Sequence, residues 1–539
     1  MPDLLLPGQP CLSTHIHIFN VMKKISCPYR LLLGFALLLS FNQCEKTPEN
    51  QLVYEAYPET TLDAGAGNWK TYVLANGQEI GLPAPDDITS TAYQAELADL
   101  KSKMAAATSE QQELARFWGG NAVLRWHEIA RELAANYNVP PNYNPDGTYP
   151  APDAANPAVY PRFPFANPPY TSRAFALLAV AQYDALVAAW HYKSQYNRLA
   201  PYKNDGSIQP LIPANDLPSY PSEDAVVAAA SRELLKFLFP GEKAYVTEKA
   251  EEHKNSRLWA GTNVQSDLSA GDSLGAKVAA RIIAYAKADK MGQANNQPAF
   301  PNQRADAETR GIPISQQWTS RDIPARPPML PFFGNVKTWN FDEAAKISLR
   351  PAAPPAVGSA EFEANLEELR GYVKNRTRDQ FRIVAYWADG VGTYTPPGHW
   401  SRKASELIYG AQMNEIRSAR AMALVNTAMQ DAGISCWDIK YYYLVPRPSE
   451  VDPKVTTCTG IPNFPAYTSG HSTFSAAAAE ILSYLFPANT AELQAMAKEA
   501  SESRIYGCIH YRFDCETGLE VGKKVGQYAV ERAKADGSE

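Results

Sequence analysis

The chain has 539 residues, of which 45% are hydrophobic and 20% are charged, and its formal net charge is −6. This length allows two or more domains with large buried cores. The mildly acidic balance and the lack of a tract rich in lysine and arginine argue against a nucleic-acid-binding protein. The 42 prolines indicate long irregular connections between elements.

Residues 1–44 have the pattern of an export signal. Met22 is followed by two lysines, and residues 31–41 form an apolar run of eleven residues, which is too short to span a membrane. Cys44 follows and precedes a polar stretch, so the segment resembles a lipoprotein signal in which Cys44 is lipidated. We therefore expect the true start at Met22 and export, as a periplasmic or outer-membrane lipoprotein or a secreted protein. The alternative is a buried apolar helix.

Residues 45–110 are expected to form an N-terminal extension, with a short strand at residues 71–74 and helical periodicity from Tyr93. Residues 139–170 are rich in proline, asparagine and tyrosine, and a loop of this length is typical of a segment that covers a surface or a site entrance. Gln182 and Asp184 interrupt an apolar helix and argue against a membrane span. In this half we expect helices at residues 117–137, 171–190, 225–239, 242–259 and 270–290.

Residues 293–358 are irregular and proline-rich, so residues 111–358 are predicted to form a first helical bundle and a connector. Residues 359–539 are predicted to form a second bundle. No strand pattern of note and no internal repeat is apparent, so the prediction is an all-α protein with two helical bundles. In the second bundle we expect helices at residues 359–373, 377–387, 400–432, 472–486 and 519–535.

Three blocks of polar side chains follow one another in the second bundle, between Trp437 and Asp514. The first covers residues 437–448, the second 464–471 and the third 503–514. Arginine gives bidentate, charge-assisted hydrogen bonds to oxyanions, and lysine adds a point charge. The set therefore suits a phosphate-like oxyanion. The candidate residues are Lys440, Arg447 and Arg504 as cations, Ser469 and the Gly470 backbone as neutral donors, and His471, His510 and Asp514.

The spacing of the blocks adds to this interpretation. Ser469-Gly-His precedes a helix, and the free N–H groups of a helix N-terminus bind anions. His510 and Asp514 lie four residues apart, so on a helix they share a face and the carboxylate can orient the ring. Arg504 and His510 do not align on one helix, so we expect a break near Gly507 that lets both point into one pocket.

In this order, the blocks resemble the superfamily of vanadium-dependent haloperoxidases and type 2 phosphatidic acid phosphatases. The details are similar to the haloperoxidases, since Trp437 stands three residues before Lys440 and Phe464-Pro-Ala-Tyr precedes the Ser-Gly-His block. The stretch from Tyr386 resembles an upstream block that carries an aspartate partner, here Asp389, for the third-block arginine. The chain departs from the pattern at Pro446, where an aromatic residue is common, and at Thr468, where proline is usual.

The resemblance implies a function. Vanadate would be bound through its metal to His510, the three cations, Ser469 and Gly470 would neutralise its oxygens, and His471 would act as acid–base. Hydrogen peroxide would then oxidise halide to hypohalous acid in the presence of an organic acceptor. Trp437 and Phe464 would line the halide pocket, although the sequence does not predict which halide is oxidised.

Two other functions remain open. In a phosphatase of the same superfamily, His510 would attack phosphorus and His471 would protonate the leaving group. The lipid phosphatases of this superfamily span membranes several times, whereas the mature chain has no apolar run of membrane-span length. The soluble acid phosphatases are short single bundles, whereas this chain carries an extra N-terminal bundle. A helical surface lipoprotein that only binds an anion is the third hypothesis.

Five further residues carry smaller predictions. His399 lies just before an expected helix, where a histidine more often caps the helix or packs under a loop than lines a pocket. Four cysteines flank the blocks, and in an oxidising compartment they allow three disulfide connectivities or four buried thiols. Sequence proximity favours Cys436–Cys458 and Cys508–Cys515. A zinc site is not expected, because no Cys-x2-Cys pair occurs.

Overall fold

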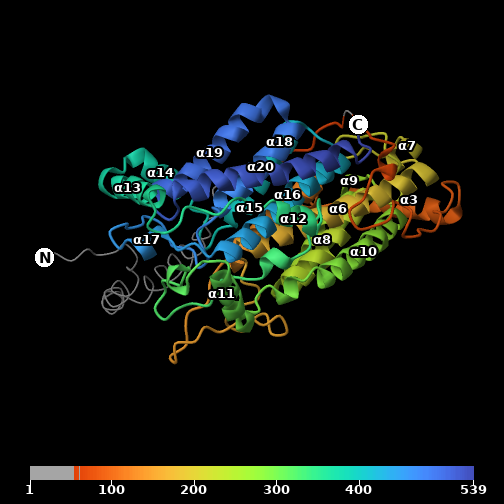
Figure 1. The fold of residues 1–539 in the computed structure, drawn as a ribbon. Helices are drawn as coiled ribbons and strands as arrows, with labels where there is room; N and C mark the ends of the chain where they lie inside the picture. The colour runs from red at the N-terminus through yellow and green to blue at the C-terminus, as the bar shows by residue number, and fades with distance from the viewer. Residues whose placement is uncertain (1–53, 60) are drawn as a thin grey trace, which may run out of the picture. The chain divides into compact units, whose positions relative to one another are not determined.

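The computed structural model describes residues 54–59 and 61–539, and every regular element in this part of the chain is a helix (Figure 1). The predicted all-α class is therefore confirmed. The described residues from Tyr54 to Glu539 form one compact unit. The predicted signal segment, with Met22 and Cys44, lies outside the described residues.

The first bundle is built around α6, which packs against α8 and α10. The first two helices of this stretch, α3 and α4, are less central and pack mainly against α9. Its helices are α3 (Thr91–Ala106), α4 (Ser109–Trp118), α5 (Ala122–Tyr137), α6 (Pro168–Tyr196), α7 (Pro201–Asn204), α8 (Glu223–Leu238), α9 (Lys243–Ala260) and α10 (Gln265–Ala288).

A connector with α11 (Phe300–Thr309) and α12 (Glu343–Ser348) leads to the second bundle. There α16 packs against α18 and α20, and α19 lies beside α18 (Figure 1). The long helices α6 and α16 also pack against each other, so the bundles meet along their central helices. The helices of the second bundle are α13 (Ala360–Asn375), α14 (Arg378–Tyr386), α15 (Thr395–Gly410), α16 (Glu415–Tyr443), α17 (Pro448–Val451), α18 (Gly470–Leu485), α19 (Thr490–Tyr506) and α20 (Arg512–Lys534).

The apolar helix α6 is a core helix. The stretch Pro168–Asn204 is long and apolar enough to cross a membrane by composition, with a mean hydropathy of 1.3, but 94% of that window is buried inside the protein. The polar groups that interrupt it have partners. Gln182 donates to the Ser231 hydroxyl over 2.9 Å, and the Asp184 carboxylate accepts three backbone N–H groups.

Those three N–H groups belong to residues 72–74, where the sequence pattern predicts a strand. The strand prediction is wrong, because the segment bends around the Asp184 carboxylate, which accepts its N–H groups over 2.8–3.0 Å. Two single helices expected from periodicity are also wrong. Residues 117–137 and 400–432 each contain a break, where Asn121 (φ 72°) and Asn414 act as N-caps of a second helix.

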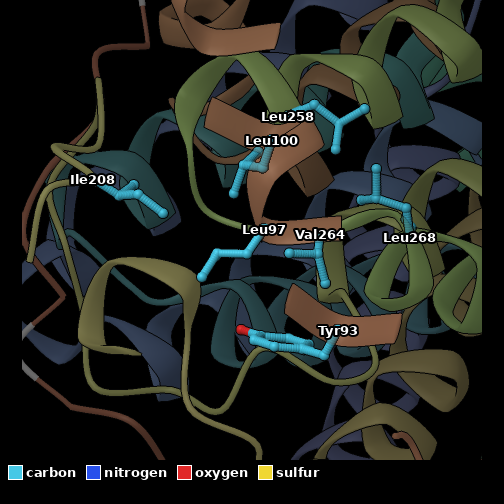
Figure 2. Packing of buried hydrophobic residues seen from close by; sticks show 8 residues of the cluster. Tyr93, Leu97, Leu100, Ile208, Leu258, Val264 and Leu268 are labelled. Atoms are coloured by element: carbon cyan, nitrogen blue, oxygen red, sulfur yellow. The ribbon is translucent and has the colours of Figure 1, made fainter. Parts of the chain in front are cut away.

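The helix α3 shows how the predicted extension joins the first bundle. Its apolar side chains enter a cluster with residues from α8, α9, α10 and the loops between them, as Figure 2 shows. A fully buried leucine side chain contributes about 1.5–3 kcal/mol by leaving water, so α3 is held by core packing. The buried members of the cluster are Tyr93, Leu97, Leu100, Ile208, Ala225, Leu258, Val264 and Leu268.

The structure contains an internal repeat that the sequence does not reveal. The runs α6–α10 and α16–α20 have the same order of elements, beginning with a 29-residue helix that ends in a left-handed C-cap, Asn197 or Leu444. Next come a four-residue helix and a 16-residue helix with a serine N-cap, Ser222 or Ser469. A proline-initiated turn and two further helices complete each run. The repeat is one of helix lengths and capping residues. Because only a few residues need to be shared to specify these, it is not visible in the sequence.

Close helix packing is repeated too. A Cβ atom on Gly275 of α10 would lie 2.3 Å from the Val226 carbonyl oxygen of α8, and one on Gly522 of α20 would lie 2.3 Å from the Thr473 carbonyl oxygen of α18. Real Cβ atoms do not approach this closely, so only glycine lets these backbones touch. In the second bundle this contact places the first turn of α18 against the third turn of α20.

Candidate functional site

The N-terminus of α18 is attached to the start of α20. Ser469 caps α18 with its hydroxyl, and its own N–H donates to the Asp514 carbonyl oxygen over 2.9 Å. Gly470 is the first residue of the helix. The first turn of α18, with His471, therefore begins beside the segment that carries the third sequence block.

His510 lies between two helices. α19 ends at Tyr506, Gly507 is its C-cap, and α20 begins at Arg512, so the chain breaks at the expected glycine. The imidazole Nδ1 lies 2.9 Å from Asp514 Oδ2, which also accepts the Tyr511 N–H over 3.0 Å. The histidine and the carboxylate meet as predicted, but through the capping turn of α20 and not along a helix face, because His510 precedes the helix.

Arg447 contacts the other side of the imidazole. Its Nη1 lies 2.9 Å from His510 Nε2 and donates to the Ile509 carbonyl over 2.8 Å. Because a guanidinium only donates, Nε2 is the acceptor, and Nδ1 carries the proton that faces Asp514. Burial, and then the charge of Arg447, hold the pKa of His510 well below its ordinary value. Burial also raises the pKa of Asp514 to about 7.

Arg504 has donor groups that the protein does not use. Its Nη1 donates to the Trp387 carbonyl and lies 2.9 Å from His471 Nε2, but Nε and Nη2 are buried without a hydrogen-bond partner. Burial lowers the pKa of Arg504 to about 10, so it remains a cation at neutral pH. A buried cation with unpaired donors is costly, and an oxyanion would pair with it. The donor set therefore fits a tetrahedral oxyanion.

Lys440 plays a different part from the arginines. Its ammonium donates to the carbonyls of Pro465, Ala466 and Thr468 over 2.6–2.9 Å, which uses all three donors. Burial lowers the pKa of Lys440 to about 7. In this structure the lysine holds the loop before Ser469 and does not line the cavity.

A cavity of about 220 Å³ opens beside these groups. Seven of the eleven predicted site residues line it. The other four do not, but each contacts or adjoins a residue that does: Lys440, Arg447, Ser469 and Asp514. The structure thus separates the predicted set into a lining layer and a supporting layer. The lining members are Gly470, His471, Arg504, His510, Trp437, Phe464 and Asp389.

The comparisons with known proteins concern the fold. Residues 486–537, which include α19 and α20, match a family model described as the VCPO second helical-bundle domain. The fold resembles that of a bacterial vanadium-dependent iodoperoxidase with a TM-score of 0.56 and 21% identity, covering 76% of this chain and 95% of that chain. The chain has the vanadium haloperoxidase fold. The recognition made from the sequence blocks is therefore confirmed at the level of the fold.

Two bacterial vanadium-dependent chloroperoxidase structures, apo and holo, are less similar. They align at 13% identity with TM-scores of 0.48 and 0.49, covering 69% and 72% of this chain and 95% and 97% of theirs. No curated protein matches the sequence. Fold similarity at these identities does not establish an activity, so the chemistry of this vanadium haloperoxidase-like chain has to be argued from its own site.

Aromatic rings form one wall of the cavity. The Trp437 and Phe464 ring centroids lie 4.8 Å apart. The Phe464 ring also lies 4.9 Å from the Lys440 ammonium and 5.1 Å from the Arg447 guanidinium. The predicted halide-pocket residues thus give the cavity an apolar surface, and Phe464 lies in contact with the Lys440 and Arg447 cations, which do not line it.

Sequence reasoning missed several lining residues. Pro140 and Phe165 come from the loop at residues 139–170, and Arg326 and Met329 come from the connector. The length of the loop was a usable signal, since a covering role was expected for it. The connector had no comparable signal, because its prolines indicated irregular structure but not where in the fold that segment would lie.

The favoured disulfides are not present. Cys436, Cys458, Cys508 and Cys515 are free thiols in the structure. The Cys436 Sγ lies 3.6 Å from the Thr468 carbonyl oxygen, and the Cys458 Sγ lies 4.0 Å from the Tyr506 carbonyl oxygen. Cys508 receives an Arg376 hydrogen bond of 3.2 Å. The pairing of cysteines by sequence proximity is wrong, because the thiols contact backbone carbonyls and Arg376 and not each other.

Proposed function

We propose that this protein is a vanadium-dependent haloperoxidase that uses hydrogen peroxide to oxidise halide to hypohalous acid. One observation carries the proposal: the unpaired, buried Nε and Nη2 of Arg504 border the same cavity as two histidines of different environment. His471 borders Arg504, while His510 is fixed by Asp514. A structural ion-pair network would leave neither free donors nor a cavity.

The residues have distinct proposed roles toward the cofactor. His510 would hold the metal of vanadate through Nε2, whose lone pair accepts from Arg447 Nη1 in this structure, because Nδ1 carries the proton that faces Asp514. Arg504 and the Gly470 N–H would bind vanadate oxygens from the cavity wall, and Arg447 and Lys440 would add charge from behind it. Vanadate, when bound, would supply Lewis-acid activation of peroxide without a change of oxidation state.

The chain itself supplies proton transfer and positioning. Burial, and then the charge of Arg504, hold the pKa of His471 well below its ordinary value, so its ring is neutral and can accept a proton from hydrogen peroxide. Fixed cations around the cavity stabilise developing negative charge without reorganisation. The apolar wall of Trp437 and Phe464 limits competing water.

The cavity also supports an organic acceptor as a partner. Its volume of about 220 Å³ exceeds the space that a halide and a peroxide need, since one water occupies about 30 Å³ in the liquid. Apolar side chains from the loop, the connector and the second bundle line its outer part. A small, largely apolar organic molecule could therefore meet the oxidised halogen inside the protein. Its lining includes Pro140, Phe165, Met329, Val391, Ile461 and Pro462.

A phosphatase remains the second candidate, and the same geometry favours it specifically. His510, with its Nδ1 held by Asp514, presents Nε2 as a nucleophile, and His471 could protonate a leaving group. Vanadate resembles the pentacoordinate state of phosphoryl transfer, so one pocket can serve both reactions. A non-catalytic anion-binding lipoprotein would need neither histidine.

One experiment separates these functions. The purified exported protein is titrated with vanadate and assayed for peroxide-dependent oxidation of iodide, bromide and chloride, beside hydrolysis of a phosphate monoester. Vanadate-dependent oxidation of any halide supports the peroxidase. Phosphate release that vanadate inhibits, without halide oxidation, replaces it with the phosphatase, and the absence of both activities supports simple binding.

We also propose that the protein is exported and attached to a membrane by lipid at Cys44. The support is the sequence pattern alone: lysines after Met22, a short apolar run and a cysteine before a polar stretch. Fractionation of the producing cells tests it, since recovery of the intact N-terminus in the cytoplasm would exclude export.

A further inference from the structure

His399, in the second turn of α15, has two polar contacts and one stacking contact near the cavity. Its Nδ1 lies 3.2 Å from Asp389 Oδ1, and its Nε2 lies 3.3 Å from the Tyr386 hydroxyl. The ring stacks on Trp387, with centroids 4.4 Å apart and planes 12° from parallel. The histidine is thus fixed in position and orientation, although no sequence block included it.

The Trp387 segment connects this histidine to α19, which carries Arg504. The Trp387 indole donates to Glu499 over 2.9 Å, and the Trp387 carbonyl accepts from Arg504 Nη1 over 2.9 Å. The neighbouring Trp400 donates to Ser475 of α18 over 2.8 Å. Hence α15 is attached to both helices that bring Arg504 and His471 to the cavity.

Asp389 is the residue on which this arrangement acts. Its side chain is 7% exposed, its φ of 43° lies in the left-handed region, and its Oδ2 is buried without a hydrogen-bond partner. Asp389 and Arg504 border the same cavity, but the expected hydrogen bond between them is not made, because Asp389 Oδ2 and Arg504 Nε and Nη2 are all unpaired. The two side chains interact through their charges. A carboxylate in a strained turn needs a partner to keep one orientation, and His399 supplies that partner at Oδ1.

We propose that His399 is a positioning residue: by binding Asp389 and stacking on Trp387, it keeps the carboxylate and the Trp387 carbonyl in the places that orient Arg504 toward an oxyanion. His399 itself touches no ligand. The inference rests on the proposed function only in that the cavity holds an oxyanion, whether vanadate or phosphate.

The first bundle supports this interpretation independently. There Trp118 donates to Glu252 over 2.9 Å and stacks on His253 at 4.4 Å, and His253 lies 2.9 Å from Asp224. This group also adjoins an arginine, Arg257, which lies 3.5 Å from Asp224. The imidazole comes from α9 there and from α15 in the second bundle, so the same unit is built from different helices beside the corresponding arginine.

The first bundle also lacks the histidines of the site. At the position of His471, two residues after the serine cap, it has Asp224. At the position of His510, immediately before the N-cap of the last helix, it has Asn263. His253 is therefore a matched control for His399, since it also pairs with an aspartate and stacks on a tryptophan, but where no oxyanion site is expected.

The test measures affinity for inorganic phosphate and for vanadate by calorimetry on the full-length protein, without an activity assay. His399→Ala should weaken both affinities about 10–100-fold, as loss of an outer partner of a site residue does. His399→Asn, whose amide nitrogen can replace Nδ1, should recover most of the affinity. The double variant His399→Ala, Asp389→Asn should bind no more weakly than Asp389→Asn alone, because one acts through the other.

Controls keep the result interpretable. Thermal unfolding of each variant shows that it is folded at the temperature of the titration, and His253→Asn should change that midpoint without changing oxyanion affinity. Wild-type affinity in His399→Ala, or a double variant whose losses add, would overturn the inference. Phosphate binding without halide oxidation by the wild type would overturn the proposed function alone, since the affinities still test His399.

Discussion

Replacing His510 by alanine should separate the metal ligand from the proton-transfer group. The His510 ring contacts Asp514 and Arg447, both over 2.9 Å and both buried. Its removal takes away the proposed metal ligand and leaves Asp514 with the Tyr511 N–H as its remaining partner at Oδ2. We expect vanadate affinity to fall by at least about 100-fold, or about 2.8 kcal/mol, and halide oxidation to be lost.

The same variant has a structural cost that the design must separate from chemistry. A buried carboxylate that loses a hydrogen bond costs about 1–3 kcal/mol, so His510→Ala should also unfold at a lower temperature. Asn263→Ala is the matched control, because Asn263 occupies the equivalent place in the first bundle. It should change stability and leave vanadate affinity and turnover as in the wild type.

His471→Ala completes the comparison. The described partner of the His471 ring is Arg504 Nη1, so its loss leaves the pairing of His510 with Asp514 in place. Turnover should fall about 10²–10⁴-fold for a missing acid–base group, while much of the vanadate affinity remains. The assay is iodide oxidation at saturating vanadate, beside calorimetric titration. If His510→Ala binds vanadate like the wild type and still oxidises iodide, the assigned roles are refuted.

Three further changes test packing, pH dependence and export. Gly522→Ala should destabilise the protein by about 1–3 kcal/mol, because the new Cβ would meet the Thr473 carbonyl at 2.3 Å, whereas Gly460→Ala, with nothing within 4 Å, should have little effect in the same denaturant titration. Burial raises the folded-state pKa of Glu415 to about 8, so the folded protein favours the protonated carboxyl. The stability that this group contributes is fully present below its unfolded-state pKa and is lost as pH rises through about 8. Glu415→Gln should flatten the fall in unfolding temperature between pH 5 and 9, and an unchanged profile would contradict the assignment. Cys44→Ser should release the protein from the membrane fraction, and release of the wild type as well would argue against lipidation.

The sequence alone determined the helical class and much of the candidate site. Helix positions follow from local periodicity and from caps such as Ser222 and Ser469, which act within one turn. The three blocks predicted which cations and histidines belong together, and the expected break at Gly507 is where α19 ends. Local signals failed where a capping residue such as Asn414 was overlooked.

The tertiary structure decided how these residues are used. It assigned the donors of Lys440 to three carbonyls and left Nε and Nη2 of Arg504 unpaired, a difference that residue type cannot reveal. It also brought the loop at 139–170 to the cavity and His399 to Asp389, left the four cysteines as free thiols and revealed the repeated helix order. These features depend on contacts between residues up to several hundred positions apart, and no periodicity or spacing in the chain records which distant surfaces will pack together.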